Sequence, residues 1–137
     1  MSRPDPHVAH TLLIVDDDEA LRLAMKIALT RDGHEVVSAA TAPRAVDLLA
    51  TDHFDLVICD VYMPGDGRSV LRHARAARTR TEIVMMTGRP SEALSADVRE
   101  HGAELVAKPI DLDDFRLIIA SHLASTELVG HPPDETA

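Results

Sequence analysis

The chain has 137 residues, enough for one domain with a single core, and 45% of them are hydrophobic although there is no Trp, one Tyr and two Phe. The net charge of -9 repels phosphate backbones and few aromatic residues are available for stacking on bases, so we expect no direct binding of nucleic acid. The single Cys59 excludes an internal disulfide, and residues 1–10 contain no apolar run of signal-peptide or membrane-spanning length. These features predict a soluble, cytoplasmic protein with an aliphatic core and no membrane attachment.

Residues 1–10 contain two Pro and no hydrophobic periodicity, and the chain end "GHPPDETA" is similar. We therefore expect a flexible N-terminal tail over 1–10, a domain over 11–124 and a flexible C-terminal tail over 125–137.

Within the domain, short apolar runs alternate with segments of helical periodicity. The apolar runs, which predict five strands, are 11–15, 35–39, 55–59, 82–86 and 104–107. The predicted helices follow Asp18 and Pro43 and cover 70–77, 91–101 and 112–123. Strands that are apolar throughout are buried on both faces, and their alternation with helices indicates right-handed crossovers. The sequence therefore predicts a doubly wound α/β fold, a five-stranded parallel sheet flanked by five helices in three layers.

Polar residues follow or end four of the predicted strands. In chain order they are Asp16, Asp17 and Asp18, then Asp60, Thr87, and Lys108, which precedes Pro109. The carboxyl ends of parallel strands lie at one edge of the sheet, where ligands bind in such folds. Several carboxylates gathered there repel one another and favour binding of a cation. All-oxygen ligands suit Mg²⁺ better than zinc, and the hydroxyl and ammonium groups suit a small oxyanion.

Each of these residues also has an ordinary structural interpretation. The Asp16–Asp18 segment resembles a helix N-cap, Thr87 a turn residue and Lys108 a surface charge. Their joint occurrence at four strand ends favours a site. Outside it, we interpret the basic stretch from Arg68 to Arg80 as a solvated helix face. The eight histidines show no metal-ligand spacing apart from His7 and His10, so we expect them at the surface. Cys59 is interpreted as a small buried apolar residue.

Four segments carry a resemblance to a known family. They are "LLIVDDDEALR", "DLVICDVYMPGDG", "VMMTG" and "AKPI". In their order and spacing, they resemble the signature segments of the receiver domain of bacterial two-component response regulators. The resemblance covers residues 10–124 and implies a flavodoxin-like (βα)5 sandwich.

The resemblance implies a role for each site residue. Asp60 would be the phosphoacceptor, with Asp16 and Asp17 holding Mg²⁺ and the carbonyl of Tyr62 adding a ligand. Lys108 would pair with the phosphoryl group and Thr87 would close on it. The Lys108–Pro109 bond would be cis.

The implied function is a phosphorylation-dependent signalling switch and not a classical enzyme. The phosphoryl donor would be a phosphohistidine on a sensor histidine kinase or histidine phosphotransfer protein. Transfer and slow dephosphorylation would be catalysed by the domain itself, and the phosphorylated state would change protein–protein contacts with a downstream target. We expect a monomer or a weak phosphorylation-dependent dimer.

The sequence departs from the family pattern at several positions. The loop after Asp60 is one residue shorter than is common, and Gly102 precedes Lys108 by six residues where seven is usual. Leu105 replaces the aromatic residue that usually reports the switch, which predicts a graded response. Two bulky side chains, Tyr62 and Arg89, take the positions that flank the hydrolytic water in receivers, which predicts slow loss of the phosphoryl group.

Two other functions remain open from the sequence. A haloacid-dehalogenase-like phosphohydrolase also uses Mg²⁺ and an Asp nucleophile, but Asp16 and Asp18 would have to serve, and Ala20 stands where Thr or Val is expected. A pseudo-receiver would be an interaction module that never takes phosphate, which the complete set of site residues disfavours.

Overall fold

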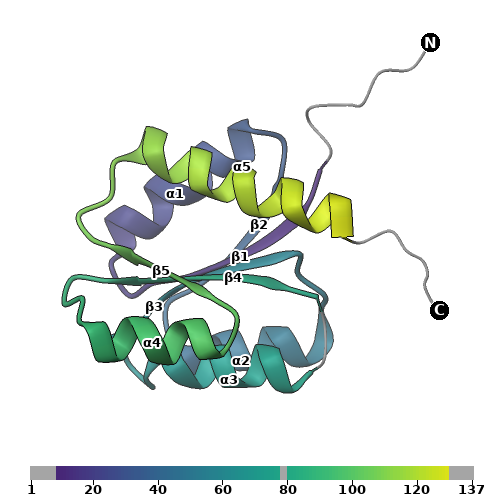
Figure 1. Ribbon diagram of the computed structural model, residues 1–137. Helices are drawn as coiled ribbons and strands as arrows, with labels where there is room; N and C mark the ends of the chain where they lie inside the picture. The colour runs from purple at the N-terminus through teal and green to yellow at the C-terminus, as the bar shows by residue number, and fades with distance from the viewer. Residues whose placement is uncertain (1–8, 78–79, 130–137) are drawn as a thin grey trace, which may run out of the picture.

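The structure, a computed structural model, describes residues 9–77 and 80–129. In these residues a parallel five-stranded sheet lies between two layers of helices (Figure 1). The strands are β1 (Thr11–Val15), β2 (Glu35–Ala39), β3 (Leu56–Asp60), β4 (Glu82–Thr87) and β5 (Glu104–Ala107). Their order across the sheet is β2-β1-β3-β4-β5. The predicted doubly wound α/β sandwich is therefore confirmed.

Five helices connect or follow these strands. They are α1 (Glu19–Arg31), α2 (Ala42–Thr51), α3 (Gly67–Ala76), α4 (Glu92–Glu100) and α5 (Leu112–Val129). Each helix follows a residue whose side-chain oxygen accepts a backbone N–H of the first turn; these residues are Asp18, Thr41, Asp66, Ser91 and Asp111. These caps satisfy N–H groups that have no partner within the helix.

The sheet separates two hydrophobic clusters because successive strand residues point to opposite faces. Helices α1 and α5 cover one face, and α2, α3 and α4 cover the other (Figure 1). In β1, for example, Leu12 and Ile14 pack on the α1/α5 side, while Leu13 and Val15 pack on the α2/α3/α4 side. Both faces of the central strands are buried, as their continuous apolar sequences predict.

The strand register brings the carboxyl ends of the central strands level with one another. Val15 pairs with Cys59, so Asp16 and Asp60 follow at the same height on neighbouring strands. Asp60 in turn pairs with Met86, the residue before Thr87. The predicted site residues on three strands therefore lie at one edge of the sheet.

Element ends differ from the sequence prediction at several points. Strand β3 includes Asp60, and α3 begins at Gly67, before the predicted start. Helix α5 continues to Val129, beyond the predicted domain end at residue 124, because no Gly or Pro interrupts the chain before Gly130. The predicted C-terminal tail over 125–137 thus begins inside a helix. The rest of that tail and residues 1–8 of the N-terminal tail lie outside the described residues.

The histidine prediction is wrong for His10, which is buried at the start of β1 and whose ring lies 5.6 Å from that of His34. His7, which has metal-ligand spacing to His10 in the sequence, lies outside the described residues. Among residues 9–77 and 80–129, no helix has the length and apolar character needed to cross a membrane.

Candidate functional site

The loop between β1 and α1 supplies two acidic residues to the site and one to the helix. Asp18 is the N-cap of α1, since its side chain accepts the N–H of Leu21 at 3.1 Å. Its own N–H donates to Oδ1 of Asp16 at 2.9 Å. The interpretation of this segment as a helix cap is therefore right for Asp18, while Asp16 and Asp17 are available for another role.

The loop after β3 closes tightly over the strand end that carries Asp60. A Cβ at Gly67 would lie 1.9 Å from the carbonyl oxygen of Asp60, so only glycine fits there. The N–H of Gly67 donates to the carbonyl of Val61 at 2.9 Å, which fixes the loop against the strand. This close approach explains why α3 begins at a glycine.

Asp16, Asp17 and Asp60 form one carboxylate cluster. One oxygen from each lies within 4.8 Å of the others, and in the described residues this is the sole group of three or more His, Cys, Asp or Glu with such spacing. Asp16 and Asp60 are buried and Asp17 is exposed. A set of oxygen donors that is open to water on one side suits a hard divalent cation that keeps part of its hydration shell. The cluster can therefore hold a metal ion.

Lys108 joins two of these carboxylates. Its Nζ lies 2.9 Å from Oδ2 of Asp16 and 3.1 Å from Oδ2 of Asp60. Burial lowers the pKa of Lys108, but Asp16 and Asp60 outweigh burial and the net shift is upward. For Asp60, burial and the neighbouring carboxylates of Asp16 and Asp17 raise the pKa, and together they outweigh the opposing effect of Lys108. The Lys108 ammonium therefore keeps its charge. Additional positive charge at the site would stabilise the ionised form of Asp60.

Thr87 and Lys108 are connected through their backbones. Thr87 is fully buried at the end of β4, and its carbonyl accepts the N–H of Lys108 at 2.8 Å. The Thr87 hydroxyl oxygen accepts the N–H of Arg89 at 2.9 Å, which ties it to the following loop. The Lys108–Pro109 peptide bond is cis, as predicted.

Two residues that depart from the family pattern, Tyr62 and Arg89, follow the ends of β3 and β4 at this edge. Tyr62 is 49% exposed and Arg89 is exposed, so both side chains border the solvent beside the cluster's strand ends. Leu105 is partly buried and packs against the hydrophobic cluster on the α2/α3/α4 side.

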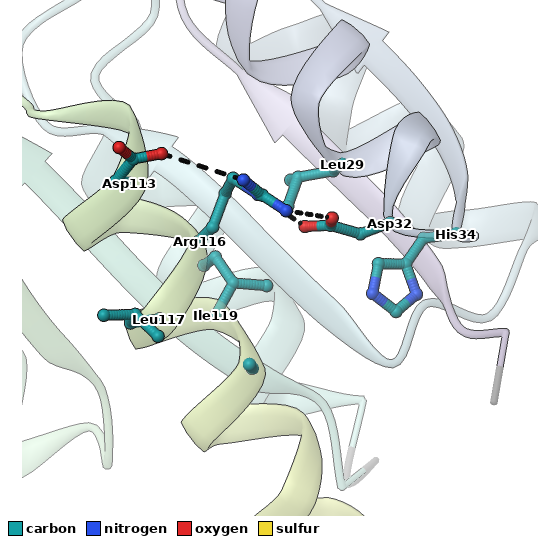
Figure 2. Close-up of a pocket in the computed structure, with 8 residues that line it drawn as sticks. Leu29, Asp32, His34, Asp113, Arg116, Leu117 and Ile119 are labelled. Carbon is teal, nitrogen blue, oxygen red and sulfur yellow. Dashed lines mark hydrogen bonds and ion pairs between the residues drawn. The ribbon is translucent and has the colours of Figure 1, made fainter. Parts of the chain in front are cut away.

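A cavity of about 460 Å³ lies elsewhere, between the end of α1 and the first turns of α5 (Figure 2). Asp32 and Arg116 line it and form two hydrogen bonds of 2.9 and 2.6 Å, and Asp113 lies 3.7 Å from the same guanidinium. None of the residues lining this cavity belongs to the carboxylate cluster or contacts Lys108 in the described pairs. The chemistry of the sheet edge is therefore separate from this cavity.

Comparison with known proteins agrees with the fold and the edge residues. The response regulator receiver domain family matches residues 12–120, well over half of the chain. The response regulator protein FleR of Pseudomonas aeruginosa is 35% identical over 130 residues, which are 93% of this chain and 27% of FleR. The chain thus spans about a quarter of that relative's length.

Two solved structures share both fold and sequence similarity. A CheY-like response regulator receiver domain protein from Methanospirillum hungatei has a TM-score of 0.83 at 30% identity, covering 88% of this chain and 98% of that one. The response regulator TrrA of Thermotoga maritima, in complex with Mg(2+)-BeF, has a TM-score of 0.72 at 26% identity, with 82% and 98% covered. The chain therefore belongs to the response regulator receiver domain family, the phosphorylation-dependent signalling switches of two-component systems.

Proposed function

We propose that Asp60 is the phosphoacceptor of this domain and that the donor is a phosphohistidine on a sensor histidine kinase or histidine phosphotransfer protein. In the transfer, an oxygen of the Asp60 carboxylate forms a bond to phosphorus while the donor's N–P bond breaks. The imidazole leaves with the bonding electrons and takes a proton from solvent. The product is an acyl phosphate on Asp60.

The observation that carries this proposal is the arrangement of Lys108 between Asp16 and Asp60, with Asp17 in the same cluster. The Asp60 side chain is buried, so its carboxylate has a defined position for attack. Its neighbours supply the Lys108 ammonium and two further carboxylates. Phosphoryl transfer depends chiefly on positioning and on neutralisation of charge, and this arrangement offers both.

We assign the carboxylate cluster to Mg²⁺, held by Asp16, Asp17, Asp60 and the backbone carbonyl of Tyr62. The donor chemistry fits, because all of these groups are hard oxygen ligands and one side of the cluster is open to water. When bound, Mg²⁺ neutralises charge on the carboxylates and on the incoming phosphoryl oxygens. The similarity to TrrA, which was solved with Mg(2+)-BeF, supports this assignment.

Lys108 and Thr87 are the other residues that act on the phosphoryl group in this proposal. The Lys108 ammonium, already near Asp60, pairs with a phosphoryl oxygen and gives up part of its contact with the carboxylate. The Thr87 hydroxyl then donates to a second oxygen and draws the loop after β4 inward. Tyr62 and Arg89 restrict the approach of water opposite the Asp60 oxygen, so that dephosphorylation is slow.

The output of the switch is a change in protein–protein contacts around α4, β5 and α5, read by a downstream protein. We assign the domain to the cytoplasm, where phosphohistidine donors act and where the buried thiol of Cys59 stays reduced. We infer a monomer that forms at most a weak dimer when phosphorylated.

The test is incubation with Mg²⁺ and a small acyl-phosphate donor, followed by intact mass spectrometry. We expect one added phosphoryl group, which hydroxylamine removes and which Asp60→Asn abolishes. A matched control is Asp66→Asn, since Asp66 lies in the same loop but bonds to Arg68. Full labelling of Asp60→Asn would reject the assignment.

The same experiment separates the phosphohydrolase alternative. In that case Asp16 would be the nucleophile and Asp18 its acid–base partner, but Asp18 caps α1 and is exposed. Labelling that is lost in Asp16→Asn and kept in Asp60→Asn would support the hydrolase. A protein that takes no phosphoryl group at all would be a pseudo-receiver.

A further inference from the structure

Arg22, the fourth residue of α1, reaches back to the loop between β1 and α1. Its Nη1 donates to the backbone carbonyl oxygen of Asp16 at 2.8 Å. That carbonyl belongs to the peptide group between Asp16 and Asp17, the two acidic residues of the β1–α1 loop. Arg22 therefore contacts the backbone of the carboxylate cluster without belonging to the cluster.

Asp16 is held on its other sides as well. Its N–H donates to the carbonyl of Ala39 on β2 at 3.1 Å, and its carboxylate is bound by the N–H of Asp18 and by Lys108. With Arg22 on the carbonyl, the backbone of Asp16 is fixed at both its N–H and its C=O. The side chain of Asp17 is exposed, and the backbone N–H of Asp17 belongs to the peptide group that Arg22 holds.

We propose that Arg22 is a positioning residue for the cation: by fixing the Asp16–Asp17 peptide plane, it aims the Asp17 carboxylate at the Asp16–Asp60 pair. The inference rests on the proposed function, because it assumes that this cluster binds Mg²⁺. Groups that orient metal ligands commonly change metal affinity strongly when they are removed, although they never touch the ion.

A purely electrostatic role for Arg22 predicts the opposite change in Mg²⁺ affinity from a positioning role. A guanidinium bound to the backbone of Asp16 adds positive charge beside the cluster and lowers its attraction for a second cation, so removal of that charge should tighten binding of Mg²⁺. Loss of positioning should weaken binding. The direction of the change in affinity therefore distinguishes a positioning role from a purely electrostatic one.

The experiment is titration of the full chain with MgCl₂ by isothermal calorimetry, in the parent and three variants. Arg22→Met keeps the aliphatic stem but loses the donors and the charge, and Arg22→Lys keeps the charge with a different donor geometry. Lys26→Met is the matched control, because Lys26 lies one turn further along α1 and borders the same small cavity as Arg22. Thermal unfolding of each variant is measured in parallel.

We expect Arg22→Met to bind Mg²⁺ roughly tenfold more weakly than the parent. Arg22→Lys should be intermediate, and Lys26→Met should bind equally or slightly more tightly. If Arg22→Met fails to fold, Arg22→Lys decides, since it must still bind more weakly than both the parent and Lys26→Met.

Other outcomes overturn the proposal. Tighter binding of Mg²⁺ by Arg22→Met would show that Arg22 acts through its charge. Unchanged affinity would also reject the positioning role, and a lower unfolding temperature with it would show that Arg22 serves only the fold. A parent protein that does not bind Mg²⁺ would instead reject the metal assignment, and the role of Arg22 with it.

Discussion

The Lys108 ammonium lies 3.1 Å from the carboxylate of Asp60. Asp16 shares the same ammonium, so removal of Lys108 leaves two buried carboxylates without their common counter-charge. We expect Lys108→Ala to lower the free energy of unfolding by about 2 kcal/mol in metal-free buffer. Because Mg²⁺ supplies positive charge at the same place, its addition should restore more stability to the variant than to the parent.

Urea denaturation with EDTA and then with excess MgCl₂ measures this effect, and Lys26→Ala is the control for loss of a lysine elsewhere. A Lys108→Ala variant as stable as the parent in EDTA would show that the ion pair contributes nothing to the resting state.

Gly67 and Gly88 offer a matched pair for the loops of the site. A Cβ at Gly67 would lie 1.9 Å from the Asp60 carbonyl oxygen, whereas a Cβ at Gly88 would meet no heavy atom within 4 Å. We expect Gly67→Ala to cost roughly 3 kcal/mol of stability or more and to reduce phosphorylation, because the backbone at Asp60 must shift. Gly88→Ala should stay within about 0.5 kcal/mol of the parent. Equal unfolding temperatures for the two variants would contradict this account of the β3–α3 loop.

His122 on α5 lies between two carboxylates at the other end of the sheet, the starts of β4 and β5. Its Nδ1 is 2.7 Å from Glu82 and its Nε2 is 2.6 Å from Glu104. Burial lowers the pKa of His122, but the two carboxylates outweigh burial and raise it above 6.5. A base with a raised pKa in the folded state contributes full stability below its unfolded pKa and loses it as the pH rises through the folded pKa.

We therefore expect His122→Gln to destabilise the domain most below about pH 6.5 and progressively less at higher pH. Urea denaturation at several pH values measures the difference from the parent. His53→Gln is the control, since His53 is 63% exposed beside Asp55. A difference that grows with pH would have the wrong sign for this interpretation.

Leu105 determines how sharply the proposed switch responds. It is partly buried against the α2/α3/α4 side and carries no polar group, so its inward and outward rotamers differ mainly in buried hydrocarbon, about 1 to 2 kcal/mol. Such a difference shifts populations by roughly an order of magnitude, which predicts a graded response. Amide chemical shifts with and without beryllofluoride measure it. Two fully separated states, with the inactive one undetectable at saturation, would show an all-or-none switch.

The fold and the meeting of Asp16, Asp60 and Thr87 at one edge of the sheet could be predicted from the sequence because both depend on local patterns. Apolar runs that end in Asp16, Asp60 and Thr87 identify parallel strands and their shared edge at the same time. Local periodicity also predicts the helix that follows Asp18, and Asp18 caps that helix.

Residues that act through distant backbone groups were not predictable in this way. Arg75 reads as part of a solvated basic face, but that prediction is wrong for it: its guanidinium donates to the carbonyls of Thr81, His101 and Gly102, and burial lowers its pKa. Arg78 and Thr79 of that stretch lie outside the described residues. The contacts of His122 with Glu82 and Glu104 likewise join elements whose relative placement no local spacing reveals.

The proposed function depends on Asp60 as the residue that carries the phosphoryl group. Its most direct test is to phosphorylate the chain with Mg²⁺ and a small acyl-phosphate donor, reduce the acyl phosphate with borohydride, and locate the modified residue by peptide mass spectrometry. Reduction converts a phosphorylated aspartate to homoserine. We expect homoserine at position 60 alone, whereas homoserine at position 16 or 17 with an intact Asp60 would contradict the assignment of Asp60 as phosphoacceptor.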